Sequence, residues 1–297
     1  MESLDRRDFL TLATATAAVP LIAGAAGPKM FVSIHETSSD GFDFRTAMEG
    51  YSKAGIKAVE PTLPKVQEFA MKESPAKARQ LLDDLGLKAV SSSNQLGLME
   101  PGPGRAKALE DLKWKVELAK TIGADRMVTP SAGQGPYTED DYKKGVDNMR
   151  EAAEIAKPFG IILMLEFART SRFAASLSTA LKLVREVNHP NYRVMIDTFH
   201  LWGGVSKFED LDLLHDGELG HLHFEDVPAE PIRELLGQPN RVFPGQGIAP
   251  LKRIVQVLKK KGYAGPASIE MFNPMYQKMD PAEFAKMARA AIEPIIA

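Results

Sequence analysis

The chain has 297 residues, of which 44% are hydrophobic and 26% are charged, so it is long enough for one large α/β domain or two small ones with a sizeable core. A formal net charge of -2 offers no basic field for nucleic acid. The absence of cysteine excludes disulfide bonds and thiolate metal ligands.

The N-terminal 26 residues have the pattern of an export signal. Arg6 and Arg7 precede an apolar, alanine-rich run over residues 12–26 that includes the small residues Ala23-Gly24-Ala25. This resembles a twin-arginine signal, so we expect residues 1–26 to engage the twin-arginine export machinery and the mature protein to be periplasmic. That route carries folded proteins and permits a metal to be loaded in the cytoplasm. The alternative is a frayed amphipathic start of the mature domain.

Beyond this segment, short β-rich runs alternate with longer helical patterns, and no Pro/Gly/Ser-rich linker divides them. We therefore expect residues 27–297 to form a single catalytic domain. No later stretch is long and apolar enough for a stable membrane span. The runs predict eight strands, at residues 30–35, 58–61, 89–93, 126–130, 161–166, 193–197, 220–224 and 267–271.

Helical patterns separate these runs, for example over residues 106–122 and 142–156, where apolar residues recur at helical spacing. Glycines that precede the next strand indicate repeated C-terminal helix caps, at Gly55, Gly86, Gly123, Gly160 and Gly262. Eight βα units of this length favour a (β/α)8 TIM barrel, with an open doubly wound sheet as the alternative.

Four of the apolar runs end in a residue that binds hard metals: Glu166, Asp197, His223 and Glu270. Taken singly, each has an ordinary structural explanation, such as a cap, an ion pair or a satisfied core histidine. In a barrel, however, these strand ends meet at one mouth, and buried carboxylates need a compensating charge. Three carboxylates and one imidazole predict one divalent metal ion, with Mn²⁺ or Mg²⁺ preferred and Zn²⁺, Co²⁺ or Fe²⁺ tolerated.

Three motifs resemble the xylose-isomerase-like sugar isomerase and epimerase superfamily, most closely its inosose (2-keto-myo-inositol) isomerase branch. They are the segments 197–200 (DTFH), 220–223 (GHLH) and 241–247 (RVFPGQG). Segments 165–167 and 268–276 follow the same branch, although Asn273 replaces its arginine and residues 91–94 are more polar than expected.

The resemblance implies that the four strand-end residues bind the metal and that Glu166 and Glu270 also serve as the acid/base pair. It implies that His200 and Arg241 bind substrate oxygens. Two further candidates for substrate binding are Trp202, where a loop could cover a sugar face, and Glu60, at another strand end. The structural alternatives are a packed loop for Trp202 and an ion pair for Glu60.

With these roles, a metal-dependent isomerase or epimerase of a keto-sugar or keto-inositol would work through an enediolate. The partner is then a small carbohydrate, and an oligomer is compatible with the sequence. Two alternatives stay open: a lyase that deglycosylates a 3-keto-glycoside at the same metal site, and a non-catalytic carbohydrate-binding barrel. The pattern argues against a DNA-cleaving enzyme with three metals, because the extra ligands and the basic face are missing.

Overall fold

The computed structural model describes residues 29–297. The expected export signal, residues 1–26, lies outside this range. Within it, eight strands form one parallel sheet: β1 (Phe31–His35), β2 (Ala58–Glu60), β3 (Lys88–Ala89), β4 (Arg126–Pro130), β5 (Ile162–Glu166), β6 (Tyr192–Asp197), β7 (Leu219–His223) and β8 (Pro266–Ile269).

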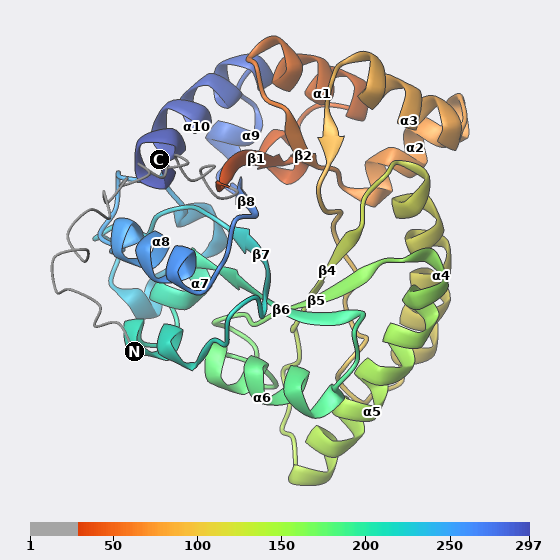
Figure 1. The fold of residues 1–297 in the computed structure, drawn as a ribbon, viewed down its shortest axis with the longest axis vertical. Helices are drawn as coiled ribbons and strands as arrows, with labels where there is room; N and C mark the ends of the chain where they lie inside the picture. Colours follow the sequence, from red (N-terminus) through yellow and green to blue (C-terminus); the bar gives the residue numbers. More distant parts are fainter. Residues whose placement is uncertain (1–28) are drawn as a thin grey trace, which may run out of the picture.

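The helices surround the sheet as an outer layer (Figure 1). They are α1 (Phe44–Lys53), α2 (Leu63–Lys72), α3 (Pro75–Asp84), α4 (Arg105–Thr121), α5 (Glu139–Ala156), α6 (Leu177–Val187), α7 (Thr198–Trp202), α8 (Leu251–Lys260), α9 (Pro274–Gln277) and α10 (Pro281–Ile296). Short 3-10 turns occupy Glu36–Ser39, Lys157–Phe159, Phe208–Leu213, Arg233–Leu235 and Gln238–Asn240. Within the described range, no helix is both long and apolar enough to cross a membrane.

The strand order is β3-β2-β1-β8-β7-β6-β5-β4, and the segment after β3 closes the ring against β4. Ser92 N donates to the carbonyl of Arg126, and the Ser92 carbonyl accepts from Val128 N, each at 3.0 Å. The predicted TIM barrel is therefore confirmed. β3 is shorter than predicted because residues 90–93 leave the regular ladder to hydrogen-bond alternately with the segment after β2 and with β4.

Alternation along the strands separates an outer core from the barrel interior. Leu163 and Leu165 of β5 belong to the large cluster that packs against the helices, whereas Met164 contacts Val128 and Met195 in a small separate cluster. Glu166 and Asp197 follow Met164 and Met195 at a spacing of two, so they share the interior face.

Helices end at the glycines that the sequence analysis predicted as C-terminal caps. Each of the five predicted capping glycines has a positive φ, between 64° and 85°. At the other end of α5, Thr138 and Asp141 form a reciprocal capping box. These local signals fix where each helix stops and where the chain turns back toward the next strand.

The first and last helices close the outer layer, since α1 and α10 lie side by side (Figure 1). Gly50 of α1 allows this approach, because a Cβ there would lie 2.6 Å from Pro281 Cβ and 3.0 Å from the Ala282 nitrogen.

We predict that Gly50→Val destabilises the fold by about 1–3 kcal/mol through overpacking at this helix contact. The measurement is urea unfolding followed by circular dichroism. Lys53→Val, at an exposed position of the same helix, is the control for helix propensity and should change stability by less than about 0.5 kcal/mol. Equal stability of the two variants would contradict the close contact.

Candidate functional site

Four chain segments bring metal-binding residue types to the same end of the barrel. Glu166, Asp197 and His223 are the last residues of β5, β6 and β7, and Glu270 directly follows β8. All four are buried, and each offers a ligand atom within 4.8 Å of the others. The structure thus brings the predicted set together, while its metal-binding role stays a prediction.

His223 stands at the centre of this set. Its Nδ1 lies 3.2 Å from Glu166 Oε1, 3.3 Å from Glu270 Oε2 and 3.8 Å from Asp197 Oδ2. Although burial lowers it, the carboxylates of Glu270 and Glu60 raise the pKa of His223 well above its ordinary value. The Nδ1 edge of the imidazole ring is therefore directed at three carboxylates.

The two glutamates have different electrostatic surroundings. Burial raises the pKa of Glu166 to about 7, against the hydrogen bond from His223. Burial also acts to raise the pKa of Glu270, but His223, His35 and Arg241 hold it at about 2. A divalent cation at the set would add positive charge beside both carboxylates and favour their ionised forms.

The donor set fits a divalent ion. Three buried carboxylates and one imidazole nitrogen offer ligand atoms within 4.8 Å of one another, and Asp197 Oδ2 pairs with the Arg241 guanidinium but accepts no hydrogen bond of good geometry within the described residues. Buried carboxylates without sufficient donors are costly, whereas hard divalent cations prefer such oxygen atoms. The site is therefore a candidate divalent metal centre with Glu166, Asp197, His223 and Glu270 as its ligands.

Arg241 is the buried cation beside these carboxylates. Its Nη1 lies 2.8 Å from Asp197 Oδ2, 2.9 Å from Glu225 Oε1 and 3.2 Å from Glu270 Oε2. The guanidinium carbon also lies 5.0 Å from the ring centres of Phe199 and Phe272. Arg241 is 1% exposed, so the structure places it inside the site rather than on the surface; its contact with substrate stays a prediction.

Glu225 is a site residue that the sequence analysis missed. It is completely buried, and its oxygens accept hydrogen bonds from Phe199 N at 3.3 Å and Glu270 N at 3.4 Å. Burial and the neighbouring Asp197 raise the pKa of Glu225 well above its ordinary value. Its position two residues beyond His223, at the mouth of β7, was the available signal.

His35 is a second missed residue, although it ends β1 as the predicted ligands end their strands. Its Nε2 lies 3.5 Å from Glu270 Oε1, and its Nδ1 accepts a hydrogen bond from Thr37 N at 3.1 Å. Its ring meets that of His223 edge-on, with 5.3 Å between centres. His35 therefore flanks Glu270 on the side of β1.

His200 lies at the site but outside the central set. It occupies the first turn of α7, where its backbone N donates to Asp197 Oδ1 at 2.8 Å, and its Nε2 is 4.0 Å from Asp197 Oδ2. Burial lowers the pKa of His200 to about 4, so the ring is neutral at pH 7. A neutral imidazole here is suited to hydrogen-bond a substrate hydroxyl, and this contact stays a prediction.

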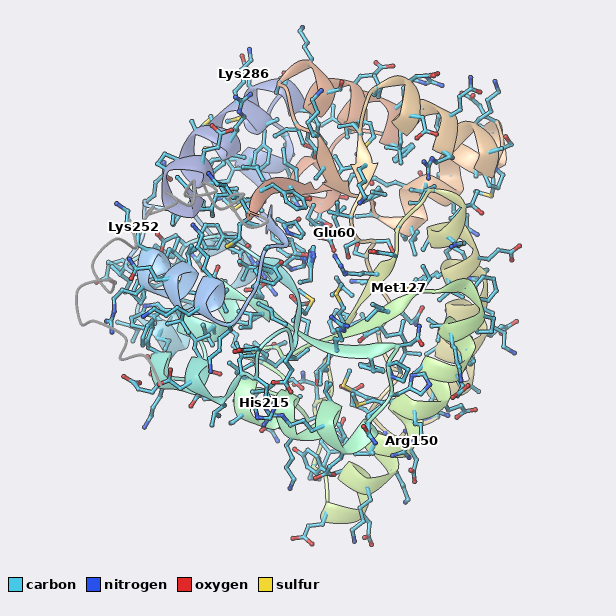
Figure 2. All side chains as sticks on the ribbon, viewed as in Figure 1. Glu60, Met127, Arg150, His215, Lys252 and Lys286 are labelled. Carbon is cyan, nitrogen blue, oxygen red and sulfur yellow. The ribbon has the colours of Figure 1, made fainter. Side chains whose placement is uncertain are left out.

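Glu60 lies in the interior of the barrel (Figure 2). It faces the Nε2 side of the His223 ring. Its Oε2 is 2.8 Å from His221 Nε2 and 3.2 Å from His223 Nε2. These contacts are made inside the barrel, with His221 and His223, and a contact of Glu60 with substrate stays a prediction. The geometry matches the alternative of a buried ion pair.

Trp202 differs in position from its predicted role. It packs against Phe199, Val227 and Leu236 and lines a cavity of about 500 Å³ together with Phe208 and other residues. The predicted metal ligands do not line that cavity. Trp202 therefore supports the loops around α7, and the alternative of a packed loop describes it better.

Asp226 anchors the loop that carries Arg241. Its Oδ2 accepts from Gly245 N at 2.9 Å and Gly247 N at 3.1 Å, while its Oδ1 accepts from Ala249 N at 3.0 Å. A Cβ at Gly247 would lie within 2.4 Å of both Asp226 and the Val227 carbonyl, so only glycine fits there. Asp226, which directly follows Glu225, thus fixes the loop that carries Arg241, the ion-pair partner of Glu225.

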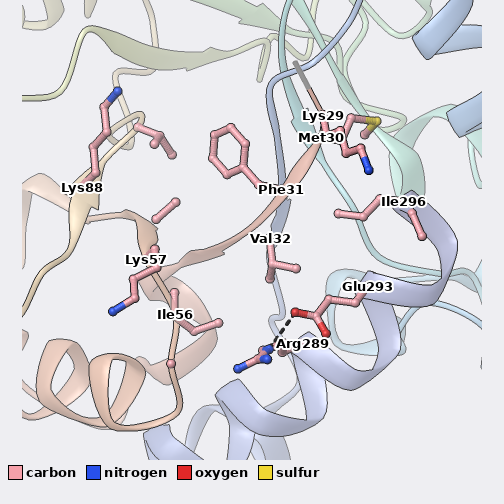
Figure 3. A pocket seen from close by; sticks show the side chains of 14 residues that line it. Lys29, Met30, Phe31, Val32, Ile56, Lys57, Lys88, Arg289, Glu293 and Ile296 are labelled. Atoms are coloured by element: carbon pink, nitrogen blue, oxygen red, sulfur yellow. Dashed lines mark hydrogen bonds and ion pairs between the residues drawn. The ribbon is translucent and has the colours of Figure 1, made fainter. Parts of the chain in front are cut away.

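The opposite end of the barrel has a cavity of about 840 Å³ (Figure 3). It is lined by the starts of β1, β2 and β3 and by the C-terminal end of α10, including Phe31, Ile56 and Arg289. The predicted catalytic residues do not line it. Size alone therefore does not locate the site in this barrel.

Comparison with known proteins agrees with the geometry. The chain is 29% identical over 189 residues to an inosose isomerase of Halalkalibacterium halodurans, covering 63% of this chain and 67% of that protein. It is 29% identical over 163 residues to a D-psicose 3-epimerase of Ruminiclostridium cellulolyticum, covering 54% of this chain and 46% of that protein.

A solved structure has the same fold. The crystal structure of a protein named IOLI, with a bound zinc atom, superposes with a TM-score of 0.82 and 22% identity. The match covers 90% of this chain and 98% of that one.

A family model provides the assignment, since it matches residues 49–293 and so spans the barrel from α1 to α10. Together with the named relatives, it confirms the prediction that the chain is an enzyme and sets aside the alternative of a non-catalytic barrel. The chain belongs to the xylose isomerase-like TIM barrel family.

Proposed function

We propose that the chain is a divalent-metal-dependent isomerase or epimerase of a keto-sugar or keto-inositol and that it works through an enediolate. The observation that carries this proposal is the convergence of two buried glutamates, Glu166 and Glu270, on the same nitrogen of His223. The names of the inosose isomerase and D-psicose 3-epimerase relatives support the substrate class.

The chemistry requires removal of a weakly acidic proton next to a carbonyl group. When bound, a divalent cation would supply charge stabilisation for the carbonyl and the neighbouring hydroxyl oxygen, and we propose Mn²⁺ as the preferred ion. One glutamate takes the proton from carbon, and the other returns a proton. Return to the same carbon from the opposite face gives an epimer, whereas return to the adjacent carbon, with a proton moving from the hydroxyl oxygen to the former carbonyl oxygen, gives an isomer.

The remaining site residues position and stabilise the substrate. Arg241 can stabilise negative charge on a substrate oxygen, because its guanidinium lies in a water-poor site between two phenyl rings. Neutral His200 can hold a hydroxyl group through one ring nitrogen. Product analysis by NMR with keto-inositols, ketoses and 3-keto-glycosides tests the proposal; release of an aglycone would instead identify the lyase alternative.

We predict that the purified protein carries about one divalent metal ion per chain, because four ligands suffice for one ion and are too few for a cluster. His223→Ala should lose most of the metal, whereas His200→Ala should keep it and lose turnover by about 10²-fold. Elemental analysis gives the stoichiometry. Equal metal loss in both variants would contradict the roles assigned to these histidines.

We predict that Glu166→Gln and Glu270→Gln each lower proton exchange next to the substrate carbonyl by about 10²–10⁴-fold. The amide preserves size and one oxygen ligand but removes the basic carboxylate. Deuterium uptake from heavy water, followed by NMR, measures exchange separately from product formation. A variant that exchanges the proton but forms no product has lost the donating step.

Metal content measured on the same samples is the control for these two variants. Exchange at the wild-type rate in both, with metal retained, would rule out the enediolate chemistry proposed for this site.

We also propose that the protein is exported folded to the periplasm by the twin-arginine route. The support is the sequence of residues 1–26 alone, in which Arg6 and Arg7 precede the apolar run.

Accordingly, we predict that the double variant Arg6→Lys, Arg7→Lys stays in the cytoplasm with an unchanged fold, because the transporter would read the guanidinium pair and the pair lies outside the predicted catalytic domain, residues 27–297. Cell fractionation with a cytoplasmic marker measures this. Normal periplasmic accumulation of the double variant would refute the export signal.

A further inference from the structure

The barrel interior directly behind the candidate metal centre is polar on one side only. Glu60 of β2, His221 of β7 and Ser268 of β8 meet there, and all three are completely buried. Across the interior, β4, β5 and β6 contribute the apolar cluster of Val128, Met164 and Met195. TIM-barrel interiors are dominated by branched apolar side chains, so this polar group requires a specific reason.

One oxygen of Glu60 is the common acceptor for three neighbouring side chains. Glu60 Oε2 lies 2.8 Å from His221 Nε2, 3.0 Å from Ser268 Oγ and 3.2 Å from His223 Nε2. Its other oxygen, Oε1, makes no hydrogen bond within the described residues. The donors therefore converge on the oxygen that faces His223, and they offset part of the cost of burying the carboxylate.

The two nitrogens of His223 consequently face different groups. Nδ1 points to Glu166 and Glu270 at 3.2 and 3.3 Å, while Nε2 points to Glu60. An imidazole binds a metal through the lone pair of one nitrogen and carries its proton on the other. A carboxylate that accepts the Nε2 proton selects the form in which Nδ1 is free to act as ligand.

We propose that Glu60 is a positioning residue of the metal centre: it holds the His223 ring with Nδ1 directed at the ligand set, and His221 and Ser268 hold Glu60 in place. The inference rests on the proposed function only in taking His223 as a metal ligand. The His221 ring also packs edge-on against the His223 ring, with 5.3 Å between centres, which limits rotation of His223.

A second metal ion is the competing explanation, since Glu60, His221 and His223 also offer ligand atoms within 4.8 Å of one another. The two explanations exclude each other, because Nε2 of His223 cannot donate a proton to Glu60 and bind an ion with the same nitrogen. A stoichiometry near two in the full chain, reduced to one in Glu60 variants, would overturn the positioning role.

The test is zinc affinity of the full chain after metal removal, measured by competition with a chelator of known affinity. Glu60→Ala should raise the zinc Kd by about 10–100-fold. Glu60→Gln, which keeps the shape and one acceptor oxygen, should raise it less. Thermal unfolding of the metal-free proteins shows whether each variant folds, and Glu60→Gln serves as the informative variant if Glu60→Ala does not fold.

Glu36→Gln is the matched control. Glu36 is also completely buried, but its carboxylate accepts hydrogen bonds from Thr62 N at 2.8 Å and Thr62 Oγ1 at 3.0 Å and does not contact His223. Its substitution should leave the zinc Kd within about twofold of wild type. A similar loss of affinity in Glu36→Gln and the Glu60 variants would show a general effect of removing a buried carboxylate and would overturn the proposal.

A spectroscopic measurement follows the ring itself. In zinc-loaded wild type, ¹⁵N NMR should show His223 with a proton on Nε2 and zinc on Nδ1, and this signature should weaken or change in Glu60→Ala. An unchanged signature together with an unchanged zinc Kd in the folded Glu60 variants would refute the positioning role.

The proposed reaction and the proposed role of Glu60 can each be refuted while the other stands. Wild type that binds one zinc ion with the predicted ring signature but converts no keto-sugar or keto-inositol leaves the role of Glu60 intact and removes the proposed reaction. Conversely, a working isomerase whose Glu60 variants bind zinc as tightly as wild type retains the reaction and removes the role of Glu60.

Discussion

The site depends on an excess of buried negative charge at one end of the barrel. Glu60, Glu166, Asp197, Glu225 and Glu270 are all buried there, and Arg241 is the guanidinium that faces three of them. Burying several carboxylates together in a low-dielectric interior costs free energy unless cations and hydrogen bonds compensate their charge. The hydrogen bonds from His223, the buried Arg241 and the fit of the set to a divalent ion all answer this one requirement.

The side chains that compensate the buried carboxylates lie in two layers, because every second residue of a strand points to the same face. His223 and Glu270 lie in the mouth layer, and His221 and Ser268 lie two residues earlier on the same strands, around Glu60. The two strands that carry the candidate ligands His223 and Glu270 therefore also carry the side chains that hold Glu60. Arg241 has a separate support, because Asp226 anchors its loop through backbone N–H groups.

The sequence predicted the parts of this arrangement that have local signals. Strand positions, capping glycines and the four ligand candidates all follow from periodicity and strand ends. Glu225 and His35 were missed although His35 ends a strand and Glu225 lies two residues beyond one, because such a position alone does not separate a site residue from an ordinary loop carboxylate or strand histidine. The orientations of Glu60 and Trp202 depend on which neighbours the closed ring provides, and short-range patterns carry no information about that.

Short-range sequence patterns also carry no information about the outcome of the reaction. Glu166 and Glu270 reach the site from β5 and β8 and approach one ring nitrogen, so proton removal and proton return can use different groups. Whether the returning proton meets the original carbon or its neighbour depends on how the substrate lies between them. Under the proposed function, Arg241 in the loop after β7 and His200 in α7 would contribute to that pose. In the proposed reaction, these two residues would set the specificity for isomer or epimer, while the strand-end carboxylates would supply the chemistry common to both outcomes.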